Sequence, residues 1–139
     1  MKTLILIRHA KSSWEHPHLK DHDRPLNQRG IKNLPMMAER LNAKEWQVDK
    51  LLSSTAKRAS LTAQGLAGAI TKDGQFEEQK ACYTFDMEQL LQQLKKTNAH
   101  IDRLALVGHN PALEDLLECL TGMEIDKFPT CAAAKLSLD

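Results

Sequence analysis

Two short aliphatic runs, LILIRH at residues 4–9 and LALVGH at residues 104–109, each end in a histidine. Runs of this length without polar alternation are typical of strands buried on both faces, which occur mainly in parallel sheets covered by helices. Ligands of such sheets bind beyond the carboxyl ends of the strands. If both strands are central and parallel, His9 and His109 emerge at the same edge of the sheet, each held by a rigid strand.

The rest of the chain alternates between strand and helix patterns. Strands are expected at residues 3–7, 48–53, 104–107 and 132–138, with a further short strand at 79–83, and helices at 27–41, 55–70, 86–96 and 110–120. This alternation predicts an α/β fold, a three-layer sandwich whose mostly parallel central sheet carries helices on both faces. The length of 139 residues suits one domain over residues 1–139.

Capping residues locate the starts of the expected helices. Asn27, Thr55 and Asp86 are plausible N-caps, and Asn110 followed by Pro111 is typical of a helix start. Apolar residues after the first cap repeat at helical spacing, at Ile31, Leu34, Ala38 and Leu41. Pro35 lies inside this repeat, which predicts a kink or a delayed start of that helix.

Composition excludes several classes of function. A net charge of +1 and an aromatic content of 4% argue against binding of nucleic acid or of a membrane surface. No apolar stretch is long enough to span a bilayer, and Arg8 interrupts the N-terminal run before it resembles a signal peptide. Three widely spaced cysteines fit reduced thiols, so we expect a cytoplasmic protein.

Positive side chains follow the expected strand ends. Arg8 precedes His9 directly, and Arg58 lies in the first turn of the helix after the second strand. A cation there opposes the helix dipole at a cost of about 0.3–1 kcal/mol, whereas an arginine at a helix start suits an anion. With His109, these side chains could surround a phosphoryl group while His9 attacks phosphorus. Because the protein supplies the positive charge, no metal or other cofactor is required.

Five segments of the chain resemble the histidine phosphatase superfamily, most closely the SixA-type phosphohistidine phosphatases. They are IRHAKSSW, RPLNQRG followed by PMMAERL, LSSTAKRASLTA, LVGHNPALEDLL and FPTCAAAKLSL. The resemblance implies a phosphoglycerate mutase-like fold and hydrolysis through a phosphohistidine at His9. It also implies that Arg8, Arg58 and His109 line the phosphate pocket and that Arg24 faces it.

The proton donor is not fixed by these patterns. Asp21 and Asp23 in KDHDRPL are the nearest candidates, with Asp21 preferred by its place before the RPL segment in SixA-like chains, and Glu88 is a third. A weakly defined acid suits a phosphoramidate P–N bond, which needs little help once its nitrogen is protonated.

Residues 16–22 allow a competing interpretation. His16, His18 and His22, with Asp21 or Asp23, could ligate a metal, but loops rich in His and Asp are often merely solvated, and we predict no metal site.

The function predicted from the sequence is a metal-independent phosphohydrolase. Its expected substrate is a phosphorylated protein bearing phosphohistidine, such as a histidine phosphotransfer domain in a two-component relay. Two alternatives stay open: a non-catalytic module that binds phosphate or a phosphoprotein, and a phosphatase or mutase that acts on small phosphoesters.

Overall fold

The structure, a computed structural model, describes residues 2–97 and 100–138. Its strands are β1 (Lys2–Arg8), β2 (Lys50–Ser54), β3 (Glu77–Gln79), β4 (Arg103–Gly108) and β5 (Ala133–Leu138). The helices are α1 (Gln28–Ala43), α2 (Lys57–Ile70), α3 (Met87–Lys96) and α4 (Ala112–Thr121), with short 3-10 helices η1 (Asp21–Asp23) and η2 (Lys80–Cys82). One sheet forms in the order β3-β2-β4-β1-β5, and β5 alone in this order is antiparallel to its neighbour.

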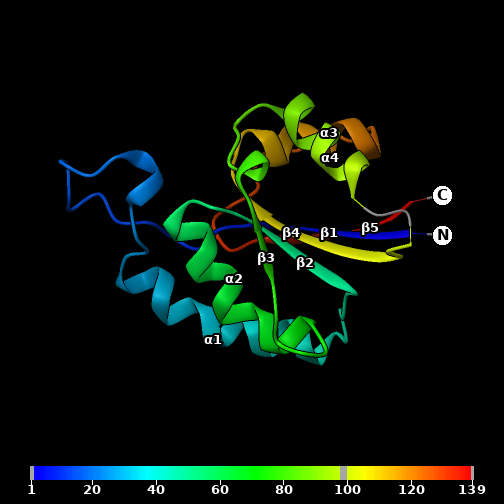
Figure 1. Ribbon diagram of the computed structural model, residues 1–139, viewed down its shortest axis with the longest axis horizontal. Coiled ribbons are helices and arrows are strands. Elements are labelled where there is room, and N and C mark those ends of the chain that lie inside the picture. Colours follow the sequence, from blue (N-terminus) through cyan, green and yellow to red (C-terminus); the bar gives the residue numbers. More distant parts are fainter. Residues whose placement is uncertain (1, 98–99, 139) are drawn as a thin grey trace.

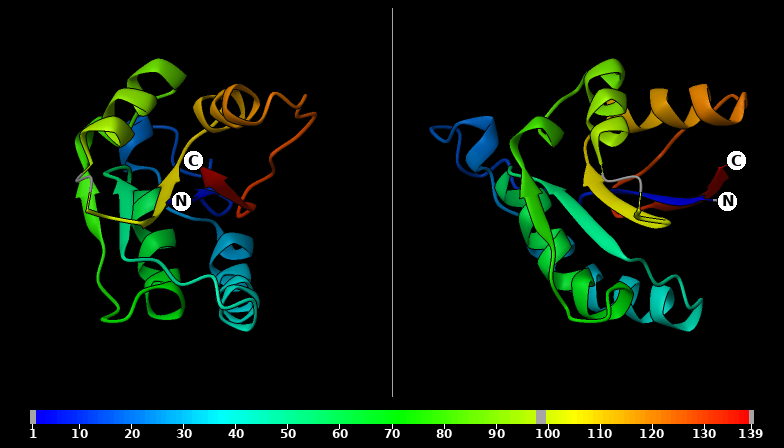
Figure 2. Two further views of the ribbon diagram at one scale, coloured as in Figure 1. Left: turned by 90° about the vertical axis from the view of Figure 1, so that its right-hand side faces the viewer. Right: turned by 45° about the vertical axis from the view of Figure 1, so that its right-hand side comes forward.

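Helices cover both faces of this sheet, with α1 and α2 on one face and α3 and α4 on the other (Figures 1 and 2). Alternate side chains of β1 point to opposite faces of the sheet. Ile5 and Ile7 pack with the α1/α2 layer, whereas Leu4 and Leu6 pack with the α3/α4 layer. The predicted three-layer α/β architecture is therefore confirmed.

The register of the parallel strands places the two histidines beside each other. Arg8 is paired with Gly108 across β1 and β4, so His9 and His109 each follow the last paired residue. The His9 N–H donates to the Gly108 carbonyl at 3.2 Å, and the two imidazole centroids lie 5.1 Å apart. Both histidines therefore emerge at one edge of the sheet, at the end away from the start of β1 (Figure 1).

Two helix starts and one strand differ from the sequence prediction. The predicted strand at residues 79–83 is wrong in its bounds, because β3 covers Glu77–Gln79 and a 3-10 turn follows it. Neither Thr55 nor Asn110 is an N-cap: α2 begins at Lys57 without a side-chain cap, and α4 begins after Pro111. The other two predicted caps are confirmed, since Asn27 accepts from the Gly30 N–H and Asp86 from the Glu88 N–H.

Helix α1 runs from Gln28 without a delayed start, and Pro35 lies inside it. Pro35 has no N–H to donate to the carbonyl of Ile31. Ile31 itself is 58% exposed, although it belongs to the apolar repeat seen in the sequence. The buried face of α1 is centred on Gly30, Leu34 and Leu41, which leaves Ile31 at the edge of the apolar stripe.

The absence of a side chain at Gly30 allows the loop over residues 10–27 to pack closely against α1. A Cβ atom there would lie 2.3 Å from the backbone oxygen of Lys11, whereas a Cβ on Gly68 in α2 would meet nothing within 4 Å. We expect Gly30→Ala to destabilise the fold by about 1–3 kcal/mol through overpacking. Gly68→Ala should be neutral or stabilise by up to about 1 kcal/mol. Urea unfolding of the two variants measures both values, and equal effects would contradict this account of the loop.

Among residues 2–97 and 100–138, no helix combines the length and the apolar character needed to cross a membrane.

Candidate active site

A cavity of about 320 Å³ lies at the carboxyl edge of the parallel strands, and we call it the carboxyl-edge cavity. It brings together Arg8, His9, Arg58 and His109, which come from the ends of β1 and β4 and the first turn of α2. The remaining lining residues are Lys11, Ser12, Trp14, Asp21, Arg24, Phe85, Asn110 and Thr130. The positive side chains that the sequence places after separate strands therefore share one cavity.

His9 is buried, and its orientation is fixed by the backbone. Its Nδ1 lies 2.7 Å from the Ala10 carbonyl oxygen. Because a carbonyl oxygen only accepts, Nδ1 carries the proton and Nε2 keeps its lone pair. Burial, together with the charges of Arg58, Arg8 and Arg24, lowers the pKa of His9 to about 4 despite the opposing bond to Ala10. The ring is therefore neutral at neutral pH, with a nucleophilic nitrogen available.

Thr62 ties the segment after β1 to helix α2. Its hydroxyl donates to the Arg58 carbonyl at 2.7 Å and accepts from the Ala10 N–H at 2.9 Å. Because Ala10 also accepts from His9, this chain of bonds sets the imidazole relative to the arginine. On the other side, the Cys131 N–H donates to the carbonyl oxygens of Arg8 and His9 at 3.1 and 3.0 Å.

His109 is held by a serine at the end of β2. Its Nε2 lies 2.8 Å from Ser54 Oγ, which also accepts from the Ala56 N–H at 3.1 Å. If the Ser54 hydroxyl donates to Nε2, Nδ1 of His109 carries the ring proton and becomes a hydrogen-bond donor. Burial and the neighbouring His9 and Arg58 lower the pKa of His109 to about 3, so this ring is also neutral at neutral pH.

Asp21 links two arginines of the cavity. Arg58 donates to the backbone carbonyl and to Oδ2 of Asp21 at 2.7 and 3.0 Å, and Arg24 donates to Oδ1 at 3.2 Å. The Tyr83 hydroxyl donates to the same Oδ2 at 2.6 Å. Partial burial raises the pKa of Asp21, but the bonds from Tyr83, Arg58 and Arg24 outweigh this and hold it at about 2. Asp21 is therefore a carboxylate at neutral pH.

Unsatisfied polar atoms gather in this cavity. Within residues 2–97 and 100–138, the buried side-chain atoms without a hydrogen-bond partner are Arg8 Nε, Arg58 Nε, His109 Nδ1 and Asn110 Oδ1. All four belong to residues that line the carboxyl-edge cavity. Buried unpartnered groups are costly and rare, so their concentration at one place indicates a binding site. Two of them are guanidinium N–H donors, which favours an anionic ligand.

The other two acid candidates lie outside this group of residues. Asp23 is mostly exposed and its carboxylate is 3.5 Å from His22 Nδ1, while Glu88 lies in the first turn of α3, where it accepts from Gln92. Neither lines the carboxyl-edge cavity.

Sequence reasoning did not single out Ser54, Tyr83, Trp14 or Phe85. Ser54 directly follows the strand predicted at residues 48–53 and is the last residue of β2, so its place at a strand end could have marked it. Tyr83 is the last residue of the strand predicted at residues 79–83 and in fact follows the 3-10 helix η2, and no local pattern connects it with Asp21.

The histidine-rich loop does not gather its side chains around one point. The rings of His16 and His18 lie 6.2 Å apart, while His22 Nε2 pairs with Thr55 Oγ1 at 2.8 Å. Within the described ranges, no group of three or more His, Cys, Asp or Glu side chains is arranged to hold a metal ion.

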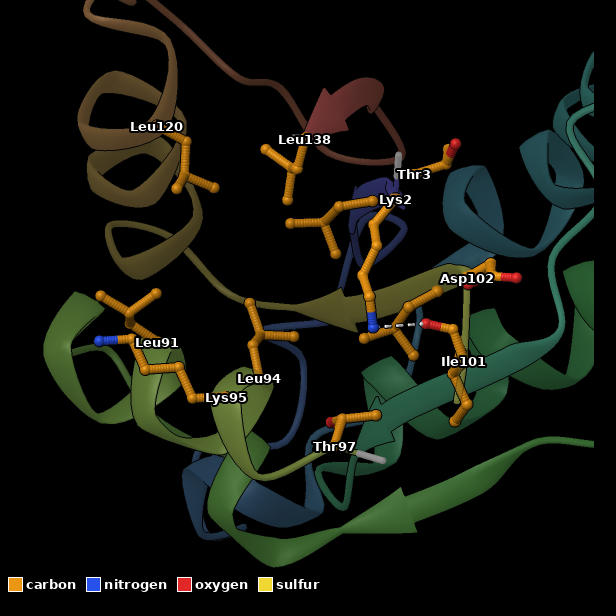
Figure 3. Close-up of a pocket in the computed structure, with 12 residues that line it drawn as sticks. Lys2, Thr3, Leu91, Leu94, Lys95, Thr97, Ile101, Asp102, Leu120 and Leu138 are labelled. Carbon is orange, nitrogen blue, oxygen red and sulfur yellow. Dashed lines mark hydrogen bonds between the residues drawn. The ribbon is translucent and has the colours of Figure 1, made fainter. Parts of the chain in front are cut away.

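A second cavity of about 200 Å³ lies at the opposite end of the sheet, between α3, α4 and the starts of β1 and β4 (Figure 3). Its lining is mainly aliphatic, with Leu94, Leu120 and Leu138 facing the space, and Lys2 Nζ donates to the Ile101 carbonyl at 3.2 Å. Within residues 2–97 and 100–138, neither arginine nor histidine lines this second cavity. Its chemistry therefore differs from that of the carboxyl-edge cavity.

Comparison with known proteins agrees with this architecture. Residues 4–82, more than half of the chain, match the sequence profile of the histidine phosphatase superfamily (branch 1). An uncharacterised chloroplast protein of Arabidopsis thaliana is 32% identical over 97% of this chain, which spans 66% of that protein. An uncharacterised protein of Mycobacterium leprae is 28% identical over 95% of this chain and 87% of its own length.

Solved structures give the same result. A protein of Agrobacterium tumefaciens assigned as phosphohistidine phosphatase SixA is 30% identical, with a TM-score of 0.86 over 96% of this chain and 90% of that one. The histidine phosphatase SixA in complex with tungstate shares the fold, with a TM-score of 0.84 at 22% identity over 99% and 88% of the two chains. The chain belongs to the histidine phosphatase superfamily, and its similarity to SixA-type members is confirmed.

Proposed function

We propose that this protein is a phosphatase that removes the phosphoryl group of protein phosphohistidine through a covalent intermediate on His9. One observation carries the proposal: a neutral, buried imidazole with a free Nε2 lies in a cavity that also holds three arginines. The similarity to SixA-type proteins supports the choice of substrate.

In the first step, His9 Nε2 attacks phosphorus while the bond between phosphorus and the substrate nitrogen breaks. Arg8 and Arg58 offer their unpartnered Nε–H groups to the phosphoryl oxygens, and His109 offers Nδ1–H. Such donors stabilise charge that develops on the oxygens in the transition state. The leaving imidazole nitrogen takes up a proton as it departs.

Asp21 has two successive roles in this proposal. Before substrate binds, its carboxylate holds Arg24 and Arg58 in place as a counter-ion. When a phosphoryl dianion binds these arginines, Asp21 loses partners that lower its pKa and gains a negative neighbour. Both changes raise the pKa of the carboxyl group and allow it to carry a proton to the leaving nitrogen.

In the second step, water attacks the phosphorus of phosphohistidine, and His9 Nε2 leaves as neutral imidazole. Asp21, once it has given up its proton, can take one from this water. Inorganic phosphate is the product. The guanidinium groups neutralise the oxygens throughout, so the proposed reaction needs no metal ion.

The pKa of His9 sets the acid limb of the expected pH profile. Because the nucleophile must be neutral and its pKa is about 4, kcat/KM should not fall as the pH is lowered from 7 to 5 and should fall below about pH 4. The measurement is the rate of phosphoramidate hydrolysis across this range, corrected for ionisation of the substrate itself. An acid limb near the ordinary histidine value of 6.5 would contradict the pKa assigned to His9.

A substrate panel tests the proposed function. The protein is incubated with a phosphohistidine-bearing phosphotransfer domain and with small phosphoesters, with EDTA and without added metal. Faster turnover of the phosphohistidine protein, unaffected by EDTA, supports the proposal. Binding without release of phosphate would indicate a binding module instead. Preferential hydrolysis of small esters, or transfer to an acceptor alcohol, would overturn the choice of substrate.

A further inference from the structure

Aromatic side chains are concentrated at the mouth of the carboxyl-edge cavity. Phe, Trp and Tyr make up only 4% of the chain, yet Trp14 and Phe85 line this cavity and Tyr83 contacts its Asp21. Trp14 is 77% exposed and Phe85 47% exposed. Large apolar side chains exposed together beside a polar pocket are typical of an interaction site.

Contacts with neighbouring residues of the site position both exposed rings. The guanidinium carbon of Arg24 lies 3.6 Å from the centroid of the Trp14 ring. Phe85 makes edge contacts with Tyr83 and with the imidazole of His109, at centroid distances of 5.7 and 5.5 Å. Each ring therefore has a fixed partner and retains exposed surface for a ligand.

The direction of the reaction places the leaving group near these rings. His9 is only 6% exposed and lies at the end of a central strand, on the inner side of the cavity. In an in-line displacement the leaving group departs on the side opposite the nucleophile. That side is the exposed mouth, where Trp14 and Phe85 lie.

We propose that Phe85 and Trp14 form a binding site for an aromatic leaving group, the imidazole ring of phosphohistidine. This inference rests on the proposed function and adds the residues that select the substrate. Phe85 already packs against one imidazole, that of His109. An aromatic pair of this kind strengthens binding by about 3- to 10-fold beyond simple burial of surface.

Two small P–N compounds isolate the contribution of the ring. N-phosphoimidazole and phosphoramidate both offer a phosphorus–nitrogen bond, but only the first has an aromatic leaving group. We expect Phe85→Leu, which keeps apolar volume without a ring, to lower the ratio of their kcat/KM values by about 3- to 10-fold. Phe85→Tyr should restore the ratio. Met123→Ala, at an exposed apolar residue after α4, is the matched control and should leave the ratio unchanged.

Non-hydrolysable ligands keep this test independent of turnover. Phenylphosphonate and methylphosphonate present the same anion with and without a ring, and calorimetry gives the ratio of their Kd values. Tighter binding of phenylphosphonate that weakens in Phe85→Leu and Trp14→Leu supports the inference. Equal Kd values in the wild type, or ratios unchanged in both variants, would overturn it. Failure of the wild type to hydrolyse either P–N compound would instead overturn the proposed function.

Discussion

Replacing His9 with alanine is expected to lower kcat for phosphohistidine hydrolysis by about 10⁴-fold or more, because the variant has no nucleophile for a covalent intermediate. Phosphate release in steady state, measured from a phosphorylated phosphotransfer domain, gives this value directly. His16→Ala is the matched control, since His16 lies in the loop over residues 10–27 and does not line the carboxyl-edge cavity.

Retained activity in His9→Ala would show that water attacks phosphorus directly, which would contradict the covalent mechanism. Thermal unfolding of the variant separates loss of chemistry from loss of fold. The His9 side chain donates to the neighbouring Ala10 carbonyl and the alanine variant keeps the backbone bond to Gly108, so we expect the fold to persist.

Substitution of Arg58 is expected to cause the second large loss of activity. Arg58→Ala should lower kcat/KM by about 10²–10³-fold, the usual loss when one donor to a developing oxyanion is removed. Arg58→Lys should recover little of this, because an ammonium group cannot reproduce the planar fork that bonds both the carbonyl and the carboxylate of Asp21.

Lys57→Ala is the control for this pair of variants. Lys57 is the exposed neighbour of Arg58 in the same turn of α2, so its loss changes the local charge equally without removing a cavity donor. Similar losses in Lys57→Ala and Arg58→Ala would mean that long-range charge, and not the geometry of the guanidinium group, accounts for the effect. Arg58→Ala should also weaken the affinity for inorganic phosphate more than Lys57→Ala does.

The central architecture was predictable because it depends on strong local signals. Residues 4–7 and 104–107 are uninterrupted aliphatic runs, and only a buried parallel strand readily accommodates them. The short edge strand β3 has the sequence EEQ, which lacks any apolar alternation, so no pattern marks it. Its pairing with β2 is a consequence of the sheet already formed and not of its own residues.

The candidate site was predictable only in part, for a related reason. The side chains at strand ends are placed by topology, so the shared edge of His9 and His109 follows once the strands are taken as parallel. The bond from Tyr83 to Asp21 joins two segments without regular strand structure, and its existence depends on packing that no spacing in the sequence encodes. Exposure of the rings at the mouth is likewise a property of the assembled surface.

Trapping of the intermediate tests the account most directly. The wild-type protein is mixed with a radiolabelled phosphohistidine substrate and quenched in alkali within milliseconds. The protein is then digested, and the peptide and the ring nitrogen that carry the label are identified. Because Nδ1 of His9 is bonded to the Ala10 carbonyl, we predict phosphate on Nε2 of His9, in an acid-labile and alkali-stable linkage. Label on Nδ1, on His109 or on no residue would contradict it.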